Sequence, residues 1–82
     1  MEDLVKSFRM VPPRYRSRLL DCARIFKGKK RKDVVKSCGI PHQILTGYFN
    51  GYSKLSDERL MRIIYYLEME DVLSYIRDEI GQ

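Results

Sequence analysis

The chain has 82 residues, 44% of them hydrophobic and 33% charged, with a formal net charge of +5 at pH 7. This length suits one domain over residues 1–82, and no run approaches the ~18 apolar residues that a membrane-spanning helix needs. The first residues, Met1-Glu2-Asp3, are not those of a secretory signal. Cys22 and Cys38 fit neither a disulfide framework nor a metal site, so we expect reduced core cysteines in a cytoplasmic protein.

Two helices are predicted in the first third of the chain. Residues 1–10 can form a short helix, which Pro12-Pro13 ends while favouring a new helix start. The second helix covers residues 14–27 and ends at Gly28. Apolar residues at helical spacing are expected to turn one side of this second helix toward the core: Tyr15, Leu19, Cys22, Ala23 and Phe26.

Residues 31–51 contain two short helix candidates around a turn. The first covers residues 33–38, and the turn is Gly39-Ile40-Pro41. The second covers residues 42–49 and ends at Asn50-Gly51. Two short helices around a glycine-containing turn, with a third helix packed behind them, are typical of a helix-turn-helix.

Two further helices are predicted in the last third. The first, residues 56–67, has Ser56 as its N-cap and acidic residues in its first turn. The second, residues 70–80, precedes Gly81 and carries apolar residues on one side: Val72, Leu73, Ile76 and Ile80. Helical spacing throughout, without a sustained alternating run, predicts an all-α domain of five main helices with room for a short extra N-terminal helix.

About half of the chain resembles a known family, without gaps. Gly39 falls on the family's turn glycine, Leu45 on the buried aliphatic residue of its recognition helix, and Asn50-Gly51 on the signature that ends this helix. The residues that fall on the helix closing the core are Leu60, Ile63, Ile64 and Leu67. The chain therefore resembles the lambda-repressor-like helix-turn-helix family, the Cro and phage-repressor (XRE-type) group, which implies a compact five-helix fold.

The chain departs from the family pattern at several positions. Val35 replaces a small Ala, Cys38 replaces a Leu, and Pro41 replaces the Ser or Thr that usually opens the recognition helix. Tyr52-Ser53 stand where basic residues often follow Asn-Gly. Contacts from this loop to a DNA backbone would therefore need different chemistry.

The resemblance implies major-groove contacts from the helix that starts near His42. Base contacts fall on His42 and Gln43, with Thr46 and Gly47 next in reach, and helical spacing turns all four outward. A Gln can pair with adenine, a His can donate to guanine, and the methyl group of a Thr suits thymine. Three alternatives stay open: His42 as a merely solvated side chain, Gly47 as room for DNA or for a core ring such as Tyr15, and Ile44 as either a thymine contact or a packing residue.

The distribution of charge favours a polyanionic partner for the first part of the chain. Residues 1–54 carry 13 Lys and Arg against 4 Asp and Glu, whereas residues 55–82 carry 3 against 7. Arg31 falls where the family has a phosphate-binding Gln. The residues expected to contact the DNA backbone are Lys29, Lys30, Arg31, Lys32, Asn50, Tyr52 and Lys54. The alternative for the basic run is a solvated loop that keeps the protein soluble.

A homodimer is expected because one domain offers few base contacts, and family members bind pseudo-palindromes as dimers. The predicted interface, which includes the helix over residues 70–80, consists of Tyr65, Tyr66, Val72, Tyr75 and Ile80. The alternative is that this surface packs the N-terminal helix through Leu4, Val5 and Phe8.

The predicted function is a sequence-specific, double-stranded DNA-binding transcriptional regulator, a repressor of phage or mobile-element type. The alternative is a protein-interaction module on the same fold, an antitoxin or an inhibitor of a host protein, acting through the acidic C-terminal half. One His, no Cys/His pair at reaction spacing and no phosphate-cradling glycine loop disfavour an enzyme. We expect no cofactor, metal, small-molecule ligand or membrane partner.

Overall fold

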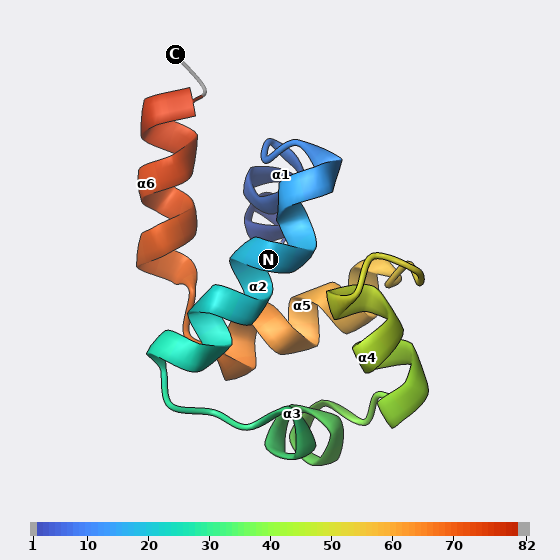
Figure 1. The fold of residues 1–82 in the computed structure, drawn as a ribbon. Helices are drawn as coiled ribbons and strands as arrows, with labels where there is room; N and C mark the ends of the chain where they lie inside the picture. The colour runs from blue at the N-terminus through green and yellow to red at the C-terminus, as the bar shows by residue number, and fades with distance from the viewer. Residues whose placement is uncertain (1, 81–82) are drawn as a thin grey trace.

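A computed structural model describes residues 2–80, and all regular secondary structure within them is α-helical. The helices in chain order are α1 (Glu2–Arg9), α2 (Pro13–Phe26), α3 (Arg31–Cys38), α4 (His42–Phe49), α5 (Asp57–Tyr66) and α6 (Glu70–Ile80) (Figure 1). The predicted all-α class and the short N-terminal helix are confirmed.

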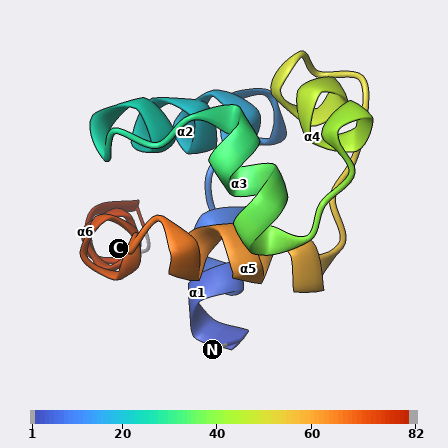
Figure 2. The same cartoon turned by 90° about the horizontal axis from the view of Figure 1, so that it is seen from below.

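Helix α5 packs against both α1 and α3. α1 packs against α6, α5 and α2, while α3 packs against α5 and α4. α4 also contacts α2, and the view from below shows α4 beside the beginning of α2 (Figure 2). α3 and α4 share no main contact with α6, whereas α1, which also belongs to the basic part of the chain, packs against both α5 and α6.

Local sequence signals account for the ends of α3, α4 and α5. α3 begins two residues earlier than predicted, because the backbone N–H of Lys30 donates to the carboxylate of Asp33 over 3.2 Å in the first turn. Gly39 ends α3 in the left-handed conformation, with φ 63°, which glycine adopts without steric strain. The Ser56 hydroxyl caps α5 as predicted, accepting from the N–H of Arg59.

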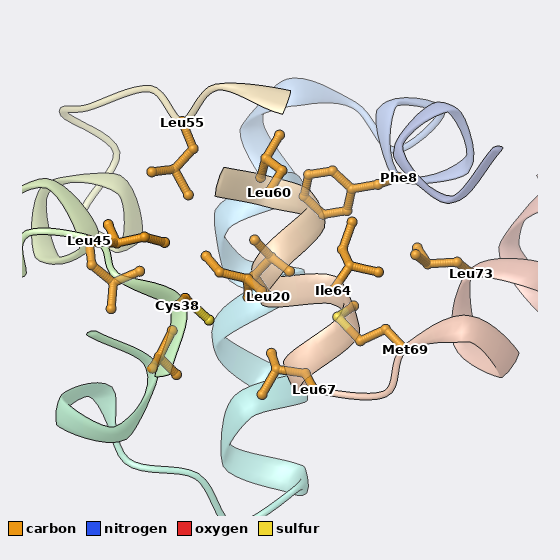
Figure 3. Packing of buried hydrophobic residues seen from close by; sticks show 13 residues of the cluster. Phe8, Leu20, Cys38, Leu45, Leu55, Leu60, Ile64, Leu67, Met69 and Leu73 are labelled. Carbon is orange, nitrogen blue, oxygen red and sulfur yellow. The ribbon is translucent and has the colours of Figure 1, made fainter. Parts of the chain in front are cut away.

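The core draws side chains from every helix of the described chain. Its buried members are Phe8, Leu20, Val34, Cys38, Ile40, Leu45, Leu55, Leu60, Ile63, Ile64, Leu67, Met69 and Leu73 (Figure 3). Burial raises the pKa of the Cys38 thiol, and the nearby Arg62 guanidinium offsets part of this rise. The prediction that Cys38 is a core residue is therefore confirmed.

The predicted core stripe of α2 is correct at Leu19 and Ala23, which pack against the core, and wrong at Tyr15, Cys22 and Phe26, which are exposed. Leu20 is fully buried, whereas Phe26 is 87% exposed and Cys22 is exposed. Two arginines of this helix are also half-buried, and their guanidinium groups donate to backbone carbonyls beyond the helix. Arg16 donates to the Val11 carbonyl over 2.8 Å, and Arg24 donates to the Lys29 carbonyl over 2.8 Å.

The apolar side predicted for α6 is confirmed at Leu73, which is fully buried. Val72, its neighbour on the predicted stripe, is 37% exposed. The side chains of Ile76 and Ile80, and residue Gly81, lie outside the described part of the structure. The contact of α6 with α1 therefore depends on Leu73 among the described apolar residues of α6.

Candidate nucleic-acid interface

The first turn of α4 is exposed while its opposite side is anchored in the core. His42 and Gln43 are exposed as predicted, and Thr46 is half-buried one turn further on. The Thr46 hydroxyl lies 3.5 Å from the Nε2 atom of His42, at hydrogen-bonding distance. Leu45 is fully buried, and this residue holds the exposed turn in place from behind.

The structure also decides the orientation of Ile44, which the sequence left open. Ile44 is half-buried and packs against the buried core, as do Tyr48 and Phe49. The packing alternative for Ile44 is therefore confirmed. The residues that α4 leaves available to a partner are concentrated in its first turn.

The prediction that Gly47 faces outward is wrong. A Cβ atom at this position would lie 2.3 Å from the Oγ atom of Ser53, in the loop after α4. The Gly47 carbonyl accepts hydrogen bonds from the backbone N–H groups of Tyr52 (2.7 Å) and Ser53 (3.1 Å). Gly47 therefore makes room for the returning loop rather than for a DNA backbone or the Tyr15 ring.

Replacing Gly47 with alanine is expected to lower the free energy of unfolding by about 1 kcal/mol, because the clash with Ser53 outweighs the better helix propensity of alanine. The Cβ–Cβ separation would be only 3.1 Å, so rotating the Ser53 hydroxyl away does not remove the clash. In a Ser53→Gly background the same replacement should instead stabilise by about 1 kcal/mol. Urea denaturation of the four proteins measures both changes, and an equal effect of Gly47→Ala in the two backgrounds would contradict this packing.

The positive charges around α4 fall into two groups. Arg31 is half-buried, donates to the Asp21 carboxylate over 3.4 Å, and lies 5.0 Å from the centre of the Phe49 ring. Lys29 lies 5.3 Å from the centre of the Tyr66 ring. These two cations stabilise contacts within the protein, which the sequence did not reveal.

The remaining predicted backbone-contacting residues are exposed: Lys30, Lys32, Asn50, Tyr52 and Lys54. Lys30 and Lys32 lie at the beginning of α3, whereas Asn50, Tyr52 and Lys54 lie in the loop that follows the last turn of α4. α4 carries no acidic residue, and the only carboxylate of α3, Asp33, accepts a hydrogen bond from the Lys30 backbone. This surface therefore combines exposed polar groups with flanking positive charge.

An acidic surface lies on α6. Its exposed carboxylates belong to Glu70, Asp71, Asp78 and Glu79, whereas those of Asp57 and Glu58 at the beginning of α5 pair with Arg9 and Arg62. Of the predicted dimer residues, Tyr75 is 67% exposed and Tyr65 and Val72 are each 37% exposed. Tyr66 is half-buried against the core, and the side chain of Ile80 lies outside the described residues.

Packing of the N-terminal helix covers part of this surface. α1 contacts both α5 and α6, and Val5 and Phe8 are buried. The alternative that the N-terminal helix packs there is therefore correct for the inner side of α6. Val72 and Tyr75 remain accessible on its outer side.

Comparison of the chain with protein-family models, curated proteins and solved structures found no match. Within residues 2–80, no helix combines the length and the apolar character needed to cross a bilayer.

Proposed function

We propose that the chain is a sequence-specific, double-stranded DNA-binding regulator of the lambda-repressor-like helix-turn-helix type. The observation that carries this proposal is the exposed first turn of α4, which the buried Leu45 anchors, with exposed lysines at the beginning of α3 and in the loop after α4. The sharp left-handed turn at Gly39 between α3 and α4, with α5 packed against α3, supports the same assignment.

In this proposal, α4 enters the major groove with His42 and Gln43 leading. Gln43 pairs with the N6 and N7 atoms of an adenine, and His42 donates to a guanine. Lys30, Lys32 and Lys54 contact phosphates beside the groove and set the orientation of the helix without reading sequence. Because Arg31 is engaged by Asp21, we assign it to holding α3 against α2 rather than to a leading phosphate contact.

Replacing Gln43 with alanine is expected to lower affinity for the preferred duplex by about 1–3 kcal/mol and to relax preference at one base pair. Affinity for random duplex should hardly change. Ser37→Ala, an exposed polar replacement on α3, is the control and should leave both affinities intact. Fluorescence anisotropy with selected and random duplexes measures the difference, and an equal loss on both duplexes would contradict the placement of α4.

We further propose that the regulator acts as a homodimer through the outer side of α5 and α6. Val72 and Tyr75 provide exposed apolar surface on α6, which lies apart from α4 (Figure 1), and Tyr65 is exposed on α5. A two-fold pairing there would leave both copies of α4 free to reach successive major grooves, about 34 Å apart.

The second candidate is a protein-interaction module that uses the acidic surface, favoured by the exposed Tyr75 and Val72 among its carboxylates. A salt titration separates the two candidates. Binding to duplex DNA that weakens steeply with salt supports the regulator, because each neutralised phosphate releases counterions. No binding to any duplex at low salt supports the interaction module.

A further inference from the structure

A cavity of about 630 Å³ opens between the end of α1, the beginning of α2, α4 and the loop before α5. Its volume is within the range of about 300–1,000 Å³ that is usual for small-molecule sites. Three of its lining residues, Phe8, Leu55 and Leu60, are buried core residues, and they lie along one edge of the core in Figure 3. The cavity therefore has an apolar floor.

The walls of this cavity carry positive charge. Its lining includes Arg9, Arg14, Arg16 and Lys54 and no carboxylate. Arg16 is held in place by the backbone carbonyls of Val11 (2.8 Å) and Arg9 (2.6 Å). A positively charged wall that is fixed before a ligand arrives favours an anion, because little side-chain entropy is lost on binding.

The other three cations differ in how firmly they are engaged. Arg9 pairs with Asp57, which does not line the cavity. The Arg14 guanidinium lies 4.8 Å from the centre of the Tyr15 ring, and no ion pair or hydrogen bond within residues 2–80 engages it or Lys54. Arg14 and Lys54 are therefore available to an incoming anion.

Hydroxyl groups complete the polar part of the lining. Ser17, Ser53 and Tyr48 all line the cavity, and no described residue hydrogen-bonds the Tyr48 hydroxyl. Burial raises the pKa of Tyr48 to about 12, although Arg16 and Arg9 lower it in part. At neutral pH the Tyr48 hydroxyl is therefore protonated and can donate to an anion.

We propose that this cavity binds a small molecule that joins a phosphate-like anion to an apolar ring. The anion is bound by Arg14, Lys54 and the preorganised Arg16, and the ring lies over the apolar floor beside Tyr48. A phosphate of a DNA backbone would supply the charge but not the apolar group that fits Phe8, Leu55 and Leu60. The proposal does not depend on the function proposed above, because it concerns binding in the absence of DNA.

Titration of phenyl phosphate into the ¹⁵N-labelled full chain tests this site. We expect saturable NMR shifts centred on the backbone amides of Ser17, Gly51 and Ser53. Phenol and inorganic phosphate, each carrying half of the ligand, should each bind at least about tenfold more weakly than phenyl phosphate. Arg14→Gln should weaken phenyl phosphate binding about tenfold, since it removes a charge-assisted hydrogen bond.

Arg18→Gln is the matched control, because Arg18 is exposed on the next turn of α2 and does not line the cavity. Lys54→Gln is the second test variant and should match Arg14→Gln. Equal losses in the Arg14 and Arg18 variants would overturn the proposal, since general surface charge would then explain the binding. Shifts centred elsewhere, or duplex DNA contacting these amides while phenyl phosphate does not bind, would also overturn it.

Discussion

Replacing Leu45 with alanine is expected to lower the free energy of unfolding by about 3 kcal/mol, because it removes buried methyl groups and leaves a cavity. Leu45 is the fully buried residue of α4 and lies within the core (Figure 3). This loss would be a large part of the stability of a domain of this size. Urea denaturation followed by circular dichroism measures the change.

Ile44→Ala is the matched control for this prediction. Ile44 precedes Leu45 on α4 and has the same number of carbon atoms, but it is only half-buried. We expect Ile44→Ala to lower the free energy of unfolding by about 1 kcal/mol, since folding removes less of the Ile44 side chain from water. A loss at Ile44 as large as that at Leu45 would mean that α4 is rotated about its axis relative to the structure.

Replacing Tyr75 with aspartate is expected to give a folded monomer that binds an operator at least about 100-fold more weakly. Tyr75 is 67% exposed in the isolated chain, so the new carboxylate does not disturb the core. In the proposed dimer it would be buried in both subunits without a partner, which strongly opposes association. A monomer loses the gain in affinity from two linked half-sites, and this gain is usually 10²–10⁴-fold, on the order of several kcal/mol.

Light scattering and anisotropy together measure this effect. Tyr75→Phe is the conservative control and should keep both the dimer and the affinity. Tyr15→Asp places the same charge on an exposed tyrosine of α2, outside the proposed interface, and should also leave the dimer intact. A wild-type chain that stays monomeric at all practical concentrations, with one protein bound per operator, would refute the homodimer.

Tyr66, which the sequence predicted as an interface residue, is a poor site for this test. Its ring is half-buried against the core and lies 5.3 Å from the Lys29 ammonium group. A charge at this position would disturb folding as well as association. The structure therefore moves the informative substitutions to the outer side of α6.

The helices around the turn could be predicted closely because their signals are local. α4 has the predicted boundaries, and Gly39, Leu45 and Ser56 have the predicted structural roles. Each role depends on residues a few positions apart, within reach of helical spacing and capping rules.

The sequence predictions that were wrong involve contacts with distant residues, which the spacing of residues along one helix does not reveal. Arg16 and Arg24 of α2 are half-buried, and their guanidinium groups donate to backbone carbonyls beyond the helix. Gly47 faces Ser53 only because the chain reverses after Asn50. Arg31 contacts Asp21 from another helix. Spacing along one helix cannot predict such contacts, because they form only when the helices are assembled.

The most direct test of the proposed function is an NMR titration of the ¹⁵N-labelled chain with random-sequence duplex DNA of about 20 base pairs, long enough for two half-sites. At low salt we predict the largest shifts at Lys30, Lys32, His42, Gln43 and Thr46, with the resonances of Val72 and Tyr75 unchanged. These shifts should reverse as salt is raised, since the contacts are largely electrostatic. No response at low salt, or a response confined to α5 and α6, would contradict DNA binding by α4.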